Sequence, residues 1–427
     1  MPLFGCITDD LTGATDLGAM LVRNGMRTVL LIGVPALGHP VPDADALVVA
    51  LPTRTAPAAQ AVSQSLEALV WLRDAGCRQF FFRYSPTFDS TEAGNIGPVG
   101  DALANALGCG FALACPATPE RACTVYQGHL FVGATLLHES GMARHPLTPM
   151  TDANLVRVLG RQTPWPVGLV PFAIVEHGPA AVRDALTRLK EQGRHWAIAD
   201  ALGEAHLHTL GTAVANHVLV TGSTAMAAGL PENFRSSGLL KIQEAPGLLP
   251  PVEGASAVIA GSCARATLAQ LGVARGSLAV LELDPFATPD AAELATQALA
   301  WAEGKLGTSP VVIATSALPD NVANLQRKLG REATAALVET TLATVAEGLV
   351  ARGVRRMVVA GGETSAAVVN RLGVTSLRIG REIAPGVPWA LAESAGPAGT
   401  KPALLMALKS GDIGAAGFFS EAFAQPA

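Results

Sequence analysis

The chain has 427 residues, of which 49% are hydrophobic and 15% are charged, and its formal net charge is -5 at pH 7. This composition excludes an intrinsically disordered chain, and the scattered 44 Gly and 29 Pro exclude a collagen-like one. The length exceeds what one hydrophobic core usually supports, so we expect two globular domains.

The charge and hydropathy of the sequence argue against a nucleic-acid partner and a membrane partner. No basic run is long enough to neutralise a row of phosphates, so we expect no nucleic-acid partner. Pro, Gly or a charge interrupts the apolar stretches, which predicts buried strands rather than membrane spans, and the N-terminus shows no signal-peptide pattern. The 6 cysteines form no CxxC pair. We therefore expect a cytoplasmic protein with no membrane partner.

In the first half of the chain, short apolar runs alternate with segments of helical periodicity. The runs that we expect to be strands are 3–7, 28–32, 46–51, 80–82, 111–114, 167–171, 197–199 and 218–221. Such alternation is typical of a parallel α/β sheet. Beyond residue 235 the sequence becomes polar and then rich in Pro and Gly, which predicts a domain boundary near residue 245.

The second half repeats this alternation. Its expected strands are 257–260, 278–283, 311–315, 357–360 and 403–408. The predicted fold class is α/β, with two mostly parallel-sheet, Rossmann-like domains at residues 1–245 and 246–427 and an active-site cleft between them.

The first candidate site is the segment ITDDLTGATD, residues 7–16. An expected strand ends there in Asp9 and Asp10, and a turn through Thr12 and Gly13 leads into a helix. Open α/β sheets bind ligands at the carboxyl ends of their strands, and a helix start offers free N–H groups to an anion. Two adjacent carboxylates at this edge indicate a catalytic or binding role, and Thr12 beside them is a candidate substrate contact. The alternative is structural, with the acids capping the turn and the glycine permitting it.

Arg54 follows the expected strand at 46–51 and so lies at the same sheet edge. Its guanidinium group could bind a substrate carboxylate through two parallel hydrogen bonds. A solvated loop arginine is the alternative.

The segment RYSPTFDSTEAGNIGPV, residues 83–99, follows the aromatic strand at 80–82. Its mixed donors and acceptors suit a polyhydroxylated ligand, and the candidate contacts are Asp89, Ser90, Thr91 and Asn95. The alternative is helix capping, because Asp89, Ser90 and Thr91 all favour the N-cap position before Glu92.

Two turns in the second half have the pattern of strand, glycine turn and helix. They are IAGSCARATLAQLG, residues 259–272, and VVAGGETSAAVVNRLG, residues 358–373. Gly261, Gly361 and Gly362 let the backbone approach an anion, so the pair suggests a nucleotide site, although each turn alone could serve only packing. Neither a Walker A loop nor a GxGxxG fingerprint occurs. The tail LKSGDIGAAGFF, residues 408–419, could add Lys409 to a phosphate site, or it could be a plain glycine-rich end.

Together these motifs resemble the four-carbon acid sugar kinase family, whose members begin with a DD[FL]TGA segment and carry a Gly-Ser-Cys turn, a GGETS turn and a KSGxxG-like tail. The resemblance extends over essentially the whole chain. It implies that residues 1–245 bind a sugar acid and that residues 246–427 bind ATP. It implies sugar-acid contacts around Asp9, Asp10, Arg54, Asp89 and Ser90. It implies ATP contacts at Ser262, Gly361, Gly362, Glu363, Thr364 and Gly411.

The segments 87–99, 124–141 and 145–155 are similar to the branch of this family that phosphorylates the terminal hydroxyl of a 3-oxo four-carbon sugar acid with ATP. Threonate and erythronate kinases are neighbouring branches and remain an alternative. Asp412 and Ile413 depart from the Asn-Phe of many relatives, so Asp412 is left out of the implied site.

The resulting hypothesis is a kinase that uses ATP and Mg²⁺, whose metal ligands the sequence does not assign. Asp10, or failing that Asp9 or Asp89, accepts the hydroxyl proton, and Arg54 holds the substrate carboxylate. A sugar-acid binding protein without catalysis is the alternative from another class, and a homodimer is compatible with the sequence.

Overall fold

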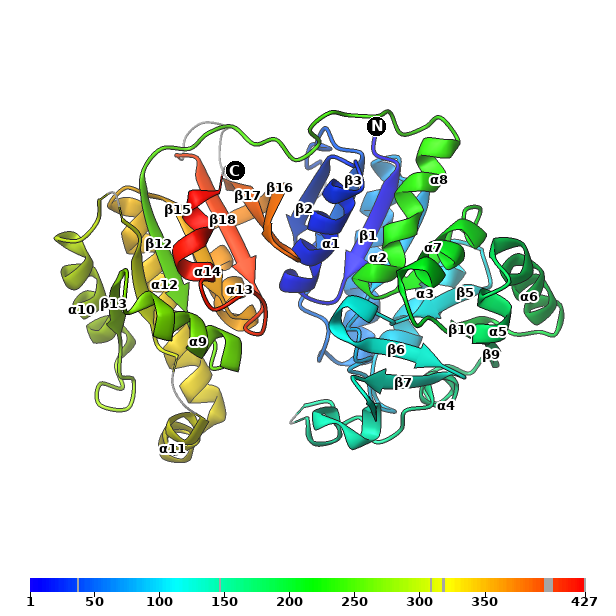
Figure 1. The fold of residues 1–427 in the computed structure, drawn as a ribbon, viewed down its shortest axis with the longest axis horizontal. Helices are drawn as coiled ribbons and strands as arrows, with labels where there is room; N and C mark the ends of the chain where they lie inside the picture. The colour runs from blue at the N-terminus through cyan, green and yellow to red at the C-terminus, as the bar shows by residue number, and fades with distance from the viewer. Residues whose placement is uncertain (37, 146, 308, 317–318, 395–401, 426–427) are drawn as a thin grey trace. The chain divides into compact units, whose positions relative to one another are not determined.

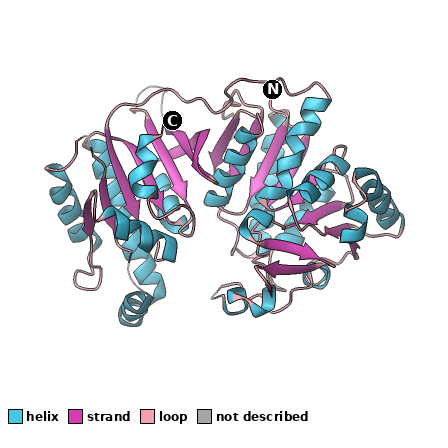
Figure 2. Ribbon diagram, viewed as in Figure 1, coloured by secondary structure: helices cyan, strands magenta, loops and turns pink. Residues whose placement is uncertain are grey.

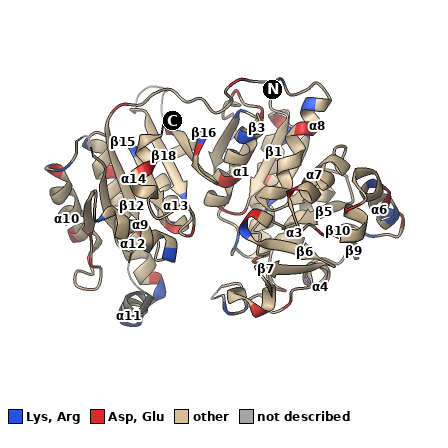
Figure 3. Ribbon diagram, in the orientation of Figure 1, with Lys and Arg blue, Asp and Glu red and all other residues tan. Residues whose placement is uncertain are grey.

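The computed structural model describes residues 1–425 except 37, 146, 308, 317–318 and 395–401 (Figure 1). The chain divides into two compact units, unit 1 (Met1–Pro246) and unit 2 (Gly247–Ala427). Each unit is a sheet with helices packed on it (Figure 2). Residues of both charge signs are interspersed along each unit (Figure 3).

Unit 1 is built on one parallel sheet. Its strands, in spatial order, are β2 (Thr28–Ile32), β3 (Ala46–Ala50), β1 (Phe4–Thr8), β4 (Gln79–Arg83), β11 (Leu219–Gly222), β5 (Ala112–Cys115), β10 (Trp196–Ala199) and β9 (Val167–Val170). Every residue of β1, β3 and β4 is buried, as expected where helices cover both faces of a sheet.

The helices of unit 1 are interspersed among its strands along the chain. They are α1 (Leu11–Arg23), α2 (Ala58–Asp74), α3 (Ile96–Ala106), α4 (Leu155–Gly160), α5 (Phe172–Val175), α6 (Pro179–Glu191), α7 (Glu204–Ala213) and α8 (Leu230–Ser236). A small antiparallel sheet of β6 (Cys123–Tyr126), β7 (His129–Val132) and β8 (Thr135–Leu136) lies between β5 and α4 in the chain. The carboxylate of Asp200, fully buried after β10, accepts hydrogen bonds from Gln127 N and Gly128 N at 2.6 and 2.8 Å and so holds the turn of this hairpin.

Unit 2 has a sheet with both parallel and antiparallel strands. In spatial order they are β13 (Ala279–Glu282), β14 (Val311–Ala314), β12 (Ala255–Ala260), β15 (Val354–Ala360), β18 (Leu404–Lys409), β17 (Val387–Ser394) and β16 (Val374–Ala384). The first five are parallel, and β17 runs antiparallel to both of its neighbours. The helices are α9 (Arg265–Ala274), α10 (Ala291–Glu303), α11 (Pro319–Leu329), α12 (Arg331–Ala351), α13 (Gly362–Leu372) and α14 (Phe418–Glu421).

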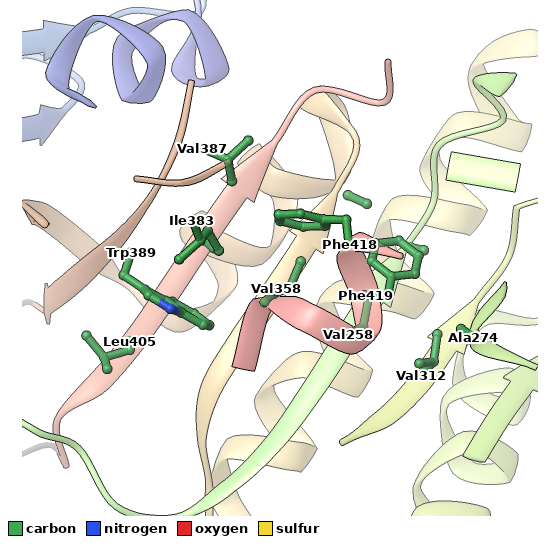
Figure 4. Close-up of a cluster of buried hydrophobic side chains, with 14 of the residues drawn as sticks. Val258, Ala274, Val312, Val358, Ile383, Val387, Trp389, Leu405, Phe418 and Phe419 are labelled. Atoms are coloured by element: carbon green, nitrogen blue, oxygen red, sulfur yellow. The ribbon is translucent and has the colours of Figure 1, made fainter. Parts of the chain in front are cut away.

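The core of unit 2 lies between the strands and the C-terminal helix. Phe418 and Phe419 of α14 are buried in one cluster with the strand residues Val258, Val312 and Val358 (Figure 4). At about 25 cal/mol per Å² of apolar surface, such burial is the main force that fixes the C-terminal segment on the sheet.

In the part of the chain that the structure describes, one helix, α12, is long and apolar enough to cross a membrane by length and composition alone. Its most apolar window has a mean hydropathy of 1.3, and 39% of that window is buried. The buried residues include Leu342, Val345 and Leu349, and α12 packs against α10, α13 and β12. This packing is typical of a helix that covers a sheet.

The α/β class with mostly parallel sheets is confirmed, and each expected strand has a counterpart in the structure. The antiparallel strands β6, β7, β8, β16 and β17 were not expected from the sequence. The cleft expected between the domains stays a prediction.

Candidate active site

The predicted site residues of unit 1 meet at the carboxyl ends of three adjacent strands. Asp9 and Asp10 follow β1, Arg54 follows β3 on one side, and Arg83 is the last residue of β4 on the other. The chain leaves β1 toward β2 and β3, whereas β4 lies on the opposite side of β1. Such a reversal of strand order is where open α/β sheets bind their ligands.

Two carboxylates and two guanidinium groups form an ion-pair cluster at this edge. Arg54 donates from Nε and Nη2 to the two oxygens of Asp9, both at 2.9 Å, and from Nη2 to Asp10 Oδ1 at 2.7 Å. Arg83 Nη1 donates to Oδ1 of Asp9 at 3.1 Å and of Asp10 at 2.8 Å. The formal charges of the four side chains therefore balance.

Only half of this cluster reaches the surface. The side chains of Asp9 and Arg83 are 6% and 4% exposed, whereas those of Asp10 and Arg54 are 24% and 29% exposed. The backbone N–H of Arg54 donates to the carbonyl oxygen of Asp9 at 3.0 Å, which fixes the loop after β3 to β1. Asp10 and Arg54 are thus the groups that a ligand can reach, and Asp9 and Arg83 hold them in place.

Asp10 is the N-cap of α1, and its carboxylate is ionised at neutral pH. Burial disfavours its carboxylate, but Arg54, Arg83 and hydrogen bonds from Thr12 Oγ1 at 2.8 Å and Gly13 N at 3.1 Å outweigh burial and lower the pKa to about 2. The bond from Gly13 confirms the capping interpretation for Asp10, whereas the Asp9 carboxylate binds arginines instead. A carboxylate with a pKa lowered in this way accepts hydrogen bonds readily but is a weak base at neutral pH.

Arg83 belongs to the cluster, although the sequence analysis named it only as the start of a polar segment. A Cβ atom at Gly13 would lie 1.9 Å from Arg83 Nη1, so glycine is required for the start of α1 to pass over the guanidinium group. Arg83 Nε also donates to Thr224 Oγ1 at 3.4 Å. The pairing of Arg83 with Thr8 in the sheet places it here, and this register was not readable from the sequence.

Asp89 lies in the loop that follows β4. Thr87 Oγ1 donates to Asp89 Oδ1 at 2.5 Å, and Phe88 between them is fully buried with φ of 59°, a backbone conformation that few residues other than glycine adopt. Burial lowers the pKa of Arg54, but Asp9, Asp10 and then Asp89 raise it above its ordinary value. The charge of Asp89 therefore acts on the same guanidinium group as the aspartate pair.

Ser90 and Thr91 are held by one glutamine. Ser90 Oγ donates to Gln162 Oε1 at 3.2 Å, and Gln162 Nε2 donates to the carbonyl oxygens of Ser90 at 3.2 Å and Thr91 at 2.7 Å. The helix α3 begins only at Ile96. The alternative that Asp89, Ser90 and Thr91 form an N-cap before Glu92 is therefore wrong, because these residues form a loop.

Asn95 joins the loop after β4 to the loop that carries Arg54. Its Nδ2 atom donates to the carbonyl oxygens of Thr53 at 2.6 Å and Ala56 at 3.1 Å, and its side chain does not cap α3. Asn95 is buried. This geometry gives Asn95 a role in positioning both loops, and its direct contact with a substrate stays a prediction.

A pocket of about 100 Å³ lies beside this loop. Its lining residues are Ser90, Thr91, Glu92, Pro149, Met150, Thr151, Asp152, Val158 and Arg161. The charge of Arg161 is compensated, because its guanidinium nitrogens lie 3.2 Å from Glu92 Oε1 and 3.8 Å from Asp152 Oδ2. The pocket connects the predicted substrate segment to residues just before α4.

The predicted ATP residues of unit 2 lie at the carboxyl ends of the adjacent strands β12, β15 and β18. A Cβ atom at Gly411 would lie 2.0 Å from Ser262 Oγ, and one at Gly261 would lie 2.2 Å from Thr364 Oγ1. Gly361 has φ of 126°, and a Cβ atom there would lie 3.3 Å from Ser262 N. The three glycine turns are therefore in mutual contact around Ser262 and Thr364.

The helices α9 and α13 both begin beside these turns. Gly362 is the first residue of α13, and Glu363 is exposed in its first turn. The free N–H groups of a helix start and a close backbone approach suit the binding of phosphate oxygens. The arrangement is thus a cradle for an anion, without the Walker A sequence that usually builds one.

Two residues of α9 that the sequence analysis did not name hold the C-terminal turn. Thr267 Oγ1 donates to Gly411 O at 2.8 Å. Gln270 Nε2 donates to the carbonyl oxygens of Ile413 at 3.0 Å and Gly414 at 2.9 Å. Both are polar residues on the buried side of an expected helix. Because buried polar groups need hydrogen-bond partners, this position could have indicated that they bind another segment.

Within the described residues, no group of three or more His, Cys, Asp and Glu could hold a metal ion. Burial and then the charge of Glu363 raise the pKa of Glu339. Mg²⁺ in nucleotide enzymes commonly uses one or two carboxylates together with phosphates and water. Glu363, exposed in the first turn of α13, fits such a partial ligand set.

Comparison with known families assigns a description to each unit. Residues 4–230 match the family described as sugar-binding N-terminal domain. Residues 257–419 match the family described as nucleotide-binding C-terminal domain. The anion cradle around Ser262 lies within the second match.

Curated relatives resemble the chain over its whole length. A 3-oxo-tetronate kinase of Burkholderia multivorans is 54% identical over 421 residues, which cover 99% of this chain and 96% of the relative. A 3-oxo-tetronate kinase of Cupriavidus necator is 53% identical over 428 residues, which cover 99% and 97%.

Solved structures resemble the chain as well. A Salmonella typhimurium protein, described with its crystal structure as a candidate tRNA synthase, has a TM-score of 0.89 and 39% sequence identity, covering 99% of each chain. The crystal structure of a Haemophilus influenzae protein has a TM-score of 0.80 and 38% sequence identity, also covering 99% of each chain.

Proposed function

This chain belongs to the four-carbon acid sugar kinase family, and from that membership we propose that it transfers the γ-phosphoryl group of ATP to the terminal hydroxyl of 3-oxo-tetronate. The product is 3-oxo-tetronate 4-phosphate. The observation that carries the proposal is the full-length similarity to 3-oxo-tetronate kinases at 54% and 53% identity. The two clusters at the strand ends supply chemistry that suits this reaction.

In unit 1 we assign the sugar acid to the exposed half of the ion-pair cluster. Arg54 binds the aspartates through Nε and Nη2, so its Nη1 is the donor that we assign to the substrate carboxylate. Asp10, with 24% of its side chain exposed, accepts the hydrogen bond of the terminal hydroxyl. Asp89 is the further carboxylate near the substrate, and Thr12, Ser90, Thr91 and Asn95 complete the proposed surroundings.

In the proposed reaction, a bond forms between the terminal oxygen and the γ-phosphorus, the bond to the bridging oxygen breaks, and ADP leaves. The transition state is largely dissociative, so the hydroxyl proton is transferred to Asp10 late in the reaction and a strong base is not needed. The lowered pKa of Asp10 fits this requirement, because the carboxylate stays charged and orients the hydroxyl.

In unit 2 we assign the phosphates of ATP to the turns at Ser262, Gly361, Gly362 and Gly411, with Thr364 beside them. Mg²⁺ accompanies ATP in this proposal and supplies charge neutralisation to the phosphates when bound. Glu363, exposed in the first turn of α13, is the carboxylate that we assign to the metal.

A substrate panel tests the proposal. The full chain is incubated with ATP, Mg²⁺ and either 3-oxo-tetronate, threonate or erythronate, and ADP formation is measured together with the phosphorylated position by phosphorus and carbon NMR. We expect phosphorylation at the terminal carbon, fastest with 3-oxo-tetronate. Faster turnover of threonate or erythronate would show that the proposed substrate is wrong. Binding of a sugar acid without ATP consumption would show that the protein is a binding protein and not a kinase. The homodimer and the cytoplasmic location stay predictions.

A further inference from the structure

Lys409 is a buried cation at the end of β18. Its side chain is 0% exposed, and its Nζ atom lies 3.3 Å from Thr267 Oγ1 and 3.3 Å from Gly411 O. The ring centroid of Phe419 is 5.8 Å away. Among the residues that the structure describes, no carboxylate forms an ion pair with this ammonium group.

An ammonium group buried without an ion pair is costly to a fold. Thr267, Gly411 and the Phe419 ring compensate only part of that cost, since all three are uncharged. Burial lowers the pKa of Lys409 to about 8, and the nearby charge of Asp412 opposes this shift. Among the described residues, Asp412 is the charged group whose field acts on this ammonium group.

The ammonium group lies directly beneath the glycine turns. Gly361 N donates to the carbonyl oxygen of Lys409 at 2.9 Å, and Gly411 O accepts from both Lys409 and Thr267. Gly411 itself packs against Ser262, as its 2.0 Å distance from a Cβ position to Ser262 Oγ shows. Lys409 is therefore joined by one or two contacts to each of the turns that form the anion cradle.

We propose that Lys409 is a positioning residue of the nucleotide site, whose buried ammonium group holds the Gly411 turn and stabilises the negative charge of the phosphates above it. This inference rests on the proposed function, namely that unit 2 binds ATP. A purely structural lysine would prop the turn equally well in its charged and neutral forms.

The two roles differ in their response to pH. Above about pH 8 the ammonium group of the free protein loses its proton, so the nucleotide meets a neutral amine. Bound phosphates favour the charged form, and ATP binding must then raise the pKa of Lys409 and take up protons. Coupling of one pKa unit corresponds to about a tenfold change in affinity.

Calorimetric titration of the full chain with Mg²⁺ and ATP, without sugar acid, measures this coupling. Between about pH 7 and pH 9.5 we expect the wild-type affinity to fall about tenfold. Titrations near pH 8.5 in buffers of different ionisation enthalpy should show net proton uptake. Lys409→Met should bind ATP about tenfold more weakly at pH 7, with no change up to pH 9.5. Lys409→Arg should keep the affinity and lose the pH dependence, because its charge persists.

The matched control is Lys305→Met, which removes an exposed lysine of the same unit whose Nζ lies over the ring of Trp301. This variant should behave as wild type. The inference is wrong if wild-type binding takes up no protons near pH 8.5, or if Lys409→Met folds and keeps the wild-type affinity and pH slope. The wild-type proton measurement decides the matter even if Lys409→Met does not fold. If wild type binds no ATP at all, the proposed function fails instead.

Discussion

The two units present the same strand order with opposite chemistry at its switch point. In unit 1 the order is β2-β3-β1-β4, and in unit 2 it is β13-β14-β12-β15, so β1 and β12 occupy equivalent places. The end of β1 carries two aspartates that bind two arginines, whereas the end of β12 carries Gly261 and Ser262. The strand order thus determines where each candidate site lies, and the residues at the strand ends determine which kind of ligand it suits.

The contrast also shows two ways of preparing a site. The unit 1 cluster is preorganised by charge, because each carboxylate is fixed by guanidinium groups before any ligand arrives. The unit 2 cluster is preorganised by the absence of side chains, because three glycines let backbone atoms approach each other and an anion. Changes of charge should therefore damage the first site most, and changes of volume the second.

Asp10→Asn should have the largest effect. Asparagine keeps the helix cap but removes the charge that orients the hydroxyl, so we expect kcat to fall by about 10²- to 10⁴-fold while ATP affinity changes little. Steady-state kinetics and calorimetry measure the two quantities. Asp16→Asn, on the same helix, is the control and should keep wild-type kcat. Normal turnover by Asp10→Asn would contradict the assignment of the ion-pair cluster to the catalytic site.

Arg83→Met should be the most destabilising change in unit 1. It leaves Asp9, which is 6% exposed, with one fewer guanidinium partner, and breaking a buried pair usually costs about 3–5 kcal/mol. Urea-induced unfolding measures the free energy. Arg157→Met, which removes an exposed arginine from its pair with Asp152, should cost much less than Arg83→Met, because water screens the charge of Arg157. Equal losses in both variants would contradict the view that Arg83 is a structural support.

Acid should reduce the stabilisation that the ion-pair cluster of unit 1 gives to the fold. The pKa of Asp10 is lowered from 3.8 to about 2 on folding, so its stabilising contribution is complete above about pH 4 and is lost as pH falls toward 2. The loss amounts to about 2 kcal/mol. We expect the free energy of unfolding of Asp10→Asn to fall less than that of wild type over this range. Parallel curves would show that Asp10 is not held by the arginines.

Gly411→Ala tests the second mode of preparation. The new methyl group would lie 2.0 Å from Ser262 Oγ, so the turn must shift and ATP should bind about tenfold more weakly. The matched control is Gly272→Ala, because the Cβ position of Gly272 in α9 has no neighbour within 4 Å. That variant should bind ATP as wild type does and be more stable by up to about 1 kcal/mol. Unchanged ATP affinity in Gly411→Ala would separate Gly411 from the cradle.

The sequence predicts the parallel strands well, because runs such as Val48 and Val49 or Ile259 and Ala260 are apolar on both faces. The edge position of Asp9 and Asp10 follows from that prediction. The bond from Arg83 to both acids does not, because it depends on which strand lies beside β1. Likewise, the sequence does not show that arginines already bind both carboxylate oxygens of Asp9.

The antiparallel strands were missed for identifiable reasons. The turn between β6 and β7 uses Gln127 and Gly128 with φ of 50° and 71°, although the usual first residue of such a turn is Asn or Asp. The strand β16 has the exposed Arg378 between the buried residues Leu377 and Ile379, but the alternation stops there, because Gly380 is buried and Arg381 is exposed. Register shifts also interrupt its pairing with β17, so no sustained two-residue period marks this strand in the sequence.

The amide of Asn95 has a consequence for redesign. Its side chain donates hydrogen bonds to Thr53 O and Ala56 O, and it thereby joins the loop that carries Arg54 to the loop between β4 and α3. A graft that exchanges only one of these loops for that of a homologue would separate the amide from its acceptors. Retargeting the enzyme to another acid should therefore succeed more often when both loops are transplanted as one inherited block.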